Sequence, residues 1–293
     1  MPIPGLTIIG ESINDSVPST HALFEANDIA GIVNLAKMQG ERGAGYIDVN
    51  VGRRPPSFMA DMVQRVQGVT ARPLSIDTPD YEIAAAGLRA YNPDRAGGQP
   101  PILNSISPLR MSLLDLHQLQ PFMPILMVSE RMEGGHPAPN TTAEETYRTA
   151  KAMLSEVRAA GLANHQLILD PGIAPIGSDT EGNLKRVMAA LRMIRDDPDF
   201  AGCHRSVGLS NFTVMLPSKR PDGMPVKGTL ESAFLTLALP LGLDMIIGSV
   251  TRKYQQLGPD HPAMVCLQEV LRRDGFEALT PLREFYAPPL DNR

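Results

Sequence analysis

Short runs of apolar and β-branched residues recur along the chain, and the stretches between them are long enough to form helices. Most runs are continuously apolar, which is typical of strands buried on both faces of a parallel sheet. Alternating strand and helix signals predict an α/β protein, and eight strands match a (β/α)8 barrel, or TIM barrel. The eight runs are Leu6–Gly10, Tyr46–Val51, Pro73–Asp77, Pro101–Ile106, Pro124–Val128, Gln166–Asp170, Arg205–Leu209 and Met245–Ser249.

The length of 293 residues fits one barrel of this kind, although it would also suit two modest domains. Nothing in the composition separates the chain into two halves. We therefore expect a single TIM-barrel domain over residues 1–293, with the barrel from about residue 6 to residue 276 and a C-terminal tail over residues 277–293.

The clearest helix signal extends from about Thr142 to Ala160, where apolar residues recur on one helical stripe. Thr142 and Glu145 have the spacing of a capping box, in which each side chain bonds the backbone of the other residue. Gly161 can close the C-terminal end, because glycine readily adopts the left-handed conformation found there. We expect a long, well-capped helix.

Two strand ends carry the signal of a helix start directly after them. In IDTPDYEIAAAGL and NSISPLRMSLLDL, Thr78 and Ser107 each precede a proline, and each is expected to cap the helix that begins there. Thr78 and Ser107 then fill the capping positions of these two helices. Asp77 and Asn104, each just upstream of a cap, are left without an evident structural task.

Several of the apolar runs end in a carboxylate or an amide, as in YIDVN, LSIDT, ILNSIS, LILDPG and VGLSN. In a barrel of parallel strands such ends open on one face, so these side chains are expected to converge on one pocket. Each has a structural explanation when taken alone, since Asp-Pro-Gly and strand-end asparagines are common in turns. Occurring together, they favour a binding site. The residues are Asp48, Asn50, Asp77, Asn104, Asp170 and Asn211.

Three segments are expected to form loops over the mouth of this pocket: Arg53–Ser57, Glu133–Asn140 and Pro217–Gly228. The third contains a basic pair, Lys219 and Arg220. The pair is either solvated or a contact for the anionic tail of a ligand, and the sequence leaves both explanations open.

Carboxylates and amides of this kind suit a flat heterocycle, because they can pair with a ring N–H and an exocyclic amine. A pterin or guanine-like edge has these groups. The six histidines show no HxxxH or HExxH spacing, and no GxGxxG follows a strand, so we expect neither a metal site nor a nucleotide-phosphate site. The corrinoid-ligating pattern DxHxxG occurs only from Asp115 to Gln120, where Gln120 replaces the glycine.

The formal net charge of −5, with Lys and Arg scattered between acids, argues against a nucleic-acid surface or a polybasic membrane patch. Small molecules or other proteins are the expected partners. The two cysteines form no CxxC pair, and no apolar run approaches the roughly 18 residues of a membrane span. The start of the chain lacks the features of a signal peptide. We expect a cytoplasmic protein.

The segments that carry these residues resemble the methyltetrahydrofolate:corrinoid/iron-sulfur protein methyltransferases, a pterin-binding family related to the folate domain of cobalamin-dependent methionine synthase. The resemblance covers residues 9–250, in the order IGESIN, GAGYIDVNVG, PLSIDTPD, ILNSIS, LILDPGIAPIG, VGLSNFTVMLP and GLDMIIGSV. Dihydropteroate synthase shares the fold and the DPG element, but it has Ser-Arg-Lys after the seventh strand and a basic motif with His after the eighth. Here Asn211 follows Ser210, and the eighth strand ends in Ser249-Val250-Thr251.

The resemblance implies roles for particular residues. Asp77, Asn104 and Asp170 would hold the pterin together with Ser210, and Asn211 would be the catalytic residue beside N5, the atom that carries the methyl group. Two positions depart from the family pattern: Val214 stands where one type of member has Gln, and Ser12 stands where IGERIN has Arg. The possible additional site residues are Glu11, Asn14, Asp48, Asn50, Lys219 and Arg220.

The activity that the resemblance implies is methyl transfer between N5 of methyltetrahydrofolate and the cobalt of a separate corrinoid protein. Tetrahydrofolate would be a substrate, cobalamin would be carried by the partner protein, and this chain would bind no metal. A homodimer is expected, without nucleic-acid or membrane partners. Two alternatives stay open: a dihydropteroate synthase, and a non-catalytic pterin-binding subunit of a methyltransfer complex.

Overall fold

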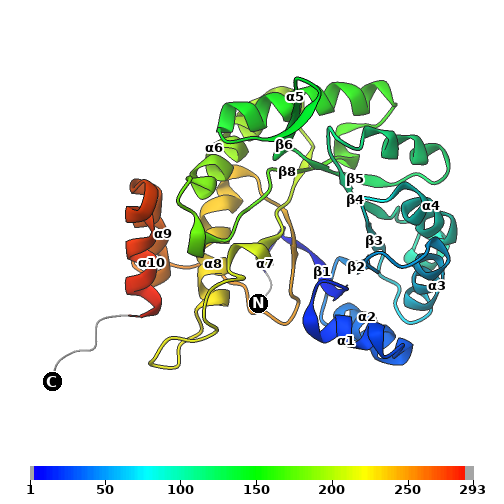
Figure 1. The fold of residues 1–293 in the computed structure, drawn as a ribbon, viewed down its shortest axis with the longest axis horizontal. Helices are drawn as coiled ribbons and strands as arrows, with labels where there is room; N and C mark the ends of the chain where they lie inside the picture. Colours follow the sequence, from blue (N-terminus) through cyan, green and yellow to red (C-terminus); the bar gives the residue numbers. More distant parts are fainter. Residues whose placement is uncertain (1–2, 288–293) are drawn as a thin grey trace.

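Eight parallel strands surround a common axis in the computed structural model, which describes residues 3–287 (Figure 1). The strand order is β10-β1-β2-β3-β4-β5-β8-β9, and each expected run overlaps one strand. The predicted TIM barrel is therefore confirmed. The strands are β1 (Thr7–Asn14), β2 (Tyr46–Asn50), β3 (Leu74–Asp77), β4 (Ile102–Ile106), β5 (Met123–Met127), β8 (Ile168–Asp170), β9 (His204–Arg205) and β10 (Met245–Gly248).

The seventh barrel strand, β9, is shorter than expected. The prediction of a strand over Arg205–Leu209 is wrong in its second half, because Leu209 already begins the short helix α7 (Leu209–Phe212). The backbone turns here instead of continuing along the sheet, and Asn211 N donates to Gly208 O over 3.0 Å. An isolated parallel bridge between Gly208 and Ile247 closes the barrel against β10.

Helices follow most strands and cover the outside of the barrel (Figure 1). The predicted helix from about Thr142 to Ala160 is confirmed as α5, with both bonds of the Thr142 and Glu145 capping box present. Gly161 follows it with φ of 89°. Besides α7, the helices are α1 (Pro18–Glu25), α2 (Ile29–Glu41), α3 (Pro56–Gln67), α4 (Tyr81–Ala90), α5 (Ala143–Ala159), α6 (Asn183–Asp196), α8 (Lys227–Ala238), α9 (Pro262–Arg272) and α10 (Leu279–Tyr286).

The two predicted caps after β3 and β4 are wrong. Asp80, not Thr78, caps α4 by accepting a bond from the backbone three residues on, while Thr78 Oγ1 only accepts from Asp80 N. Aspartate is the stronger capping residue, so the helix starts later than expected. Ser107 accepts from Leu109 N, but the element that follows is a 3₁₀ helix, Met111–Gln118.

Apolar side chains fill the barrel interior, so the barrel is a packed core and not a pore. Two larger apolar clusters lie elsewhere, one involving α2–α5 and the other involving α6 and α8–α10. The buried side chains of this interior layer are Ile9, Ile102, Ile125, Ile168 and Met245. Because they fill the interior, a cavity can form only at the ends of the strands.

The loop predicted over Glu133–Asn140 is largely an antiparallel hairpin of β6 (Glu130–Glu133) and β7 (His136–Pro139). Gly134 and Gly135 form its turn with φ of 58° and 84°, values that favour glycine. The other two predicted loops, Arg53–Ser57 and Pro217–Gly228, run into the first turns of α3 and α8.

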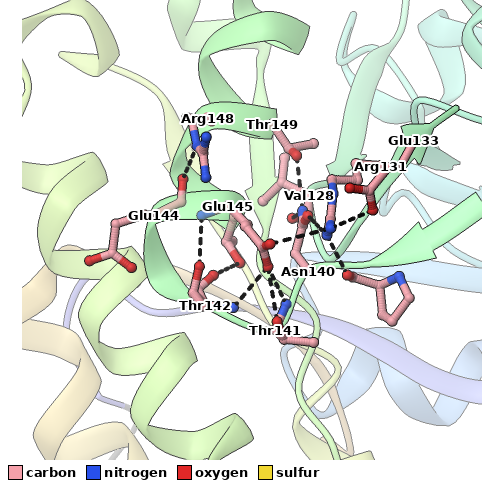
Figure 2. A network of polar contacts seen from close by, with 12 residues as sticks. Val128, Arg131, Glu133, Asn140, Thr141, Thr142, Glu144, Glu145, Arg148 and Thr149 are labelled. Carbon is pink, nitrogen blue, oxygen red and sulfur yellow. Dashed lines mark hydrogen bonds and ion pairs between the residues drawn. The ribbon is translucent and has the colours of Figure 1, made fainter.

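A polar network anchors this hairpin to α5 (Figure 2). Arg131 pairs with Glu145 over 3.3 Å and with Glu133 over 2.7 Å. Asn140 donates from Nδ2 to the carbonyl of Val128 and to Oγ1 of Thr149, both over 2.9 Å. The hairpin is therefore held in one place beside the barrel mouth.

The predicted C-terminal tail, 277–293, is described as far as residue 287, and residues 288–293 lie outside the described residues. Within it, α10 buries Leu282 and Phe285 in an apolar cluster shared with α9. Across residues 3–287 there is no helix whose length and apolar character would let it cross a membrane.

Candidate functional site

A cavity of about 810 Å³ opens at the carboxyl ends of the barrel strands. Most of the predicted site residues lie around it, and they come from strands and a short helix that are far apart in the sequence. Asn50, Lys219 and Arg220 are not part of its described lining. The predicted residues that line the cavity are Glu11, Asn14, Asp48, Asp77, Asn104, Asp170, Ser210 and Asn211.

An irregularity in β1 brings Glu11 and Asn14 to the cavity. The register between β1 and β2 shifts after Gly10, and such bulges redirect side chains. Buried Gln39 holds the irregular segment by accepting a bond at Oε1 from Ser12 N over 2.9 Å. A Cβ on Gly10 would lie 2.5 Å from that oxygen, so this close approach requires glycine.

Asp48 and Asp77 form a buried acidic pair on one side of the cavity. Asp48 is fully buried, and neither of its carboxylate oxygens has a hydrogen-bond partner within residues 3–287. Burial raises the pKa of Asp48 well above its usual range, and the Asp77 carboxylate raises it further. Burial also raises the pKa of Asp77, against a lowering bond from Asn50. The pair therefore retains a proton at a pH where exposed aspartates have lost theirs.

Asp170 faces the cavity at the start of the Asp-Pro-Gly turn. Its Oδ1 accepts from Gly172 N over 2.8 Å, and its Oδ2 accepts from Ser206 Oγ over 3.0 Å. Burial raises the pKa of Asp170 to about 6, although both bonds and the charge of Arg186 oppose the rise. Gly172 has φ of 65°, and a Cβ there would come within 2.6 Å of Ser129. Asp170 thus belongs both to the turn and to the cavity wall.

Arg186 of α6 supports this turn, a role that was not predicted from the sequence. The side chain is almost fully buried and donates to the carbonyls of Pro171 over 2.8 Å and Gly172 over 2.7 Å, and to Thr146 Oγ1 over 2.9 Å. Burial lowers the pKa of Arg186, against the charges of nearby aspartates. Four basic residues occur in α6, and nothing in their spacing marks one of them as buried.

The opposite wall is formed by the short helix α7. Ser210 Oγ donates to Glu11 Oε2 over 2.7 Å, which joins α7 to β1. The side chain of Asn211 is exposed toward the cavity, and its Nδ2 lies over Gly208, where a Cβ would come within 2.9 Å. Val214, the position of the departure from the family pattern, also lines the cavity and is 55% exposed.

The remaining three predicted residues act elsewhere. Asn50 lines an adjoining cavity of about 510 Å³ and donates from Nδ2 to Asp77 Oδ2 over 2.8 Å. Arg220 pairs with Asp222 over 3.2 Å, and its guanidinium lies 5.4 Å from the ring centre of Phe285 in α10. Lys219 is exposed on the same loop. Of the basic pair, Arg220 is therefore packed against α10 and Lys219 is exposed to solvent.

The chemistry of the cavity is that of hydrogen-bond recognition. Three aspartates and three asparagines offer acceptors and donors from separate walls, which suits a flat ring with N–H and amine groups. In the described part of the chain, no group of three or more His, Cys, Asp or Glu residues stands close enough together to hold a metal ion.

Comparisons with known proteins give a family and a fold. A family model described as "Pterin binding enzyme" matches residues 13–248. A methylcorrinoid:tetrahydrofolate methyltransferase of Eubacterium limosum is 27% identical over 259 residues, which cover 85% of this chain and 86% of that protein.

Solved dihydropteroate synthases have a similar fold. One from Xanthomonas albilineans is 19% identical, with a TM-score of 0.56 over 91% of both chains. One from Vibrio fischeri is 16% identical, with a TM-score of 0.57 over 83% of this chain and 86% of that one. At these identities the likeness shows the fold alone.

Proposed function

Because the chain belongs to the family of pterin binding enzymes, we propose that it moves a methyl group between N5 of methyltetrahydrofolate and the cobalt of a corrinoid held by a separate protein. The relative from Eubacterium limosum, whose name describes this kind of transfer, supports the proposal. The homodimer and the cytoplasmic location belong to the same proposal and rest on the family resemblance.

The observation that carries the proposal is the position of Asn211. It faces a cavity whose other walls present Asp77, Asn104 and Asp170. The carboxylates would pair with the N–H and amine groups of the pterin, and the asparagine amide would reach the side of the ring that carries N5.

An amide donor at N5 fits the reaction. A tertiary amine is a poor leaving group, so the bond between N5 and the methyl carbon breaks readily only as N5 gains a proton or a stronger hydrogen bond. Asn211 can donate such a bond without being consumed, and a donor that binds more tightly in the transition state accelerates the step. The methyl carbon is transferred to cobalt of the second substrate, and the electron pair of the broken bond stays on N5.

Anaerobic mixing of the protein with methyltetrahydrofolate and cob(I)alamin tests the proposal, with the methylcobalamin spectrum as the readout. We expect methylcobalamin to form, and the Asn211→Ala variant to be slower by roughly 10² to 10³ in a single turnover. A wild-type rate in the variant would remove Asn211 from catalysis.

Two other outcomes would replace the proposal. Tight folate binding without any change in the corrinoid spectrum would favour a non-catalytic pterin-binding subunit. Consumption of para-aminobenzoate with a pterin pyrophosphate would favour a dihydropteroate synthase.

A further inference from the structure

We propose that two carboxylates, half-buried Glu11 of β1 and fully buried Glu231 of α8, position the amide of Asn211 by holding Ser210 and Thr213 on either side of it. The inference rests on the proposed function, since it concerns how the donor at N5 is held in place. Neither carboxylate needs to touch the substrate for this role, and Glu231 lies outside the described lining of the cavity.

The segment that carries Asn211 cannot hold itself in place. The helix α7 spans only Leu209–Phe212, a single turn, and isolated turns of helix are unstable. Two side-chain bonds compensate. Ser210 Oγ donates to Glu11 Oε2 over 2.7 Å, and Thr213 Oγ1 donates to Glu231 Oε1 over 2.5 Å. Ser210 inside the turn and Thr213 directly after it are thus tied to different elements, β1 and α8.

Glu231 is a fully buried carboxylate of α8, between buried Leu230 and buried Ser232. Arg252 Nε lies 2.8 Å from its Oε2, which makes an ion pair without hydrogen-bond geometry. A buried carboxylate is strongly unfavourable unless it is paired and hydrogen-bonded, so the partners Arg252 and Thr213 are required together. Burial raises the pKa of both Glu11 and Glu231, against lowering bonds from Ser210 and Thr213.

Small displacements of the Asn211 amide matter for the proposed step. A productive donor must stay within about 0.5 Å of its intended geometry. On one side Nδ2 lies against Gly208, in a place where a Cβ would come within 2.9 Å of it. On the backbone side the two carboxylates prevent α7 from shifting along the barrel mouth.

Matched substitutions at Thr213 test the inference. Thr213→Val removes only the donor to Glu231, and Thr213→Ser keeps it. We expect the single-turnover rate of Thr213→Val to fall roughly tenfold or more, with the folate dissociation constant changed far less, and Thr213→Ser to restore the rate. Thr236→Val is the matched control in α8, the helix that carries Glu231. It removes the acceptor of the bond from Leu257 N and should leave the rate unchanged.

Two measurements separate this inference from the proposed function. In the Asn211→Ala background, Thr213→Val should slow the reaction no further, because both changes act through one amide. In addition, the Asn211 side-chain amide should give one sharp NMR resonance pair in the wild type and Thr213→Ser, and a broadened or doubled pair in Thr213→Val. The NMR comparison holds even where no methyl transfer is found.

A wild-type rate together with an unchanged amide resonance in Thr213→Val would overturn the inference. Should Thr213→Val fail to fold, Thr213→Ala provides the same comparison. Absence of methyl transfer by the wild type, combined with the expected resonance change, would refute the proposed function while leaving the positioning role in place.

Discussion

Asn50 donates a hydrogen bond from Nδ2 to Oδ2 of Asp77 over 2.8 Å. Its own Oδ1 accepts from the backbone N–H of Gly52 over 2.9 Å, so the amide is held in one orientation. Asn50 therefore acts on a carboxylate of the cavity instead of lining the cavity itself. Asn50, a possible additional site residue by sequence, thus contacts a second predicted site residue, Asp77.

Replacing Asn50 by Leu should weaken pterin binding by about 1 kcal/mol, the usual contribution of one hydrogen bond. The bond from Asn50 lowers the pKa of Asp77, so its loss raises that pKa. As the pH is lowered, the Asp77 carboxylate should then become protonated, and pterin binding should weaken, at a higher pH than in the wild type. Folate titrations over a pH series measure both effects, and an unshifted profile would exclude the role of Asn50.

Asp170→Asn should weaken pterin binding by roughly 1 to 3 kcal/mol, because a charge-assisted pair becomes a neutral bond. The Asn side chain has nearly the same size, so the turn should remain. Quenching of protein or ligand fluorescence by titration gives the dissociation constant. An unchanged constant in a folded variant would remove Asp170 from the site.

The same carboxyl should make the stability of the unliganded protein depend on pH. The pKa of Asp170 is about 6 in the folded protein and 3.8 in the reference state, so its contribution is fully present below pH 3.8 and is lost as pH rises through about 6. The shift of about 2 units corresponds to an upper limit of about 3 kcal/mol.

Comparison with Asp170→Asn isolates this contribution, because the pKa values of Asp48 and Asp77 are raised as well and titrate in the same direction. We expect the wild type to lose stability relative to the variant as pH rises from about 4 to about 6.5, followed by a constant difference. Urea unfolding at several pH values provides the test. A difference that does not vary with pH would contradict the raised pKa.

Arg186→Met should destabilise the protein by about 2 to 4 kcal/mol, since the carbonyls of Pro171 and Gly172 lose a charged donor in a buried place. The charge of Arg186 lowers the pKa of Asp170, so the variant should also bind pterin less well near neutral pH. Arg192→Met on the exposed side of α6 is the matched control. Equal effects of the two substitutions would show that Arg186 has no special role.

Lys219 and Arg220 should respond differently to alanine substitution. Lys219→Ala should raise the Michaelis constant more for polyglutamylated folate than for the monoglutamate, an effect that salt reduces. Arg220→Ala should instead cost about 0.5 to 1 kcal/mol of stability, because its guanidinium packs against Phe285. Selective loss of polyglutamate affinity in Arg220→Ala would reverse these assignments.

The arrangement of the cavity was predictable because its side chains stand at strand ends, where the topology alone brings them together. Asp77 and Asn104 pair directly in the register of β3 and β4. Residues supplied by helices were not predictable in this way. Glu231 did leave a signal, as the single carboxylate of an apolar helix, whereas Arg186 left none.

Helix starts were less predictable than strand ends. Thr78 and Asp80 are both good capping residues two positions apart, and the choice between them depends on how the chain leaves β3. The hairpin of β6 and β7 was not predicted because its short strands, ERME and the proline-containing HPAP, lack the apolar character of the barrel strands.

The two-residue length of β9 determines where the barrel opens first. β9 pairs with β8 at two positions, and a single bridge joins its continuation to β10, whereas β3 and β4 each pair with both neighbours over three or more residues. Local opening there breaks few backbone bonds, so the amide hydrogens around Val207 and Ile247 should exchange with solvent sooner than those of β3 and β4. The sheet therefore gives α7 little backbone support on the β9 side, and the side-chain bonds of Ser210 and Thr213 hold that turn where the sheet does not.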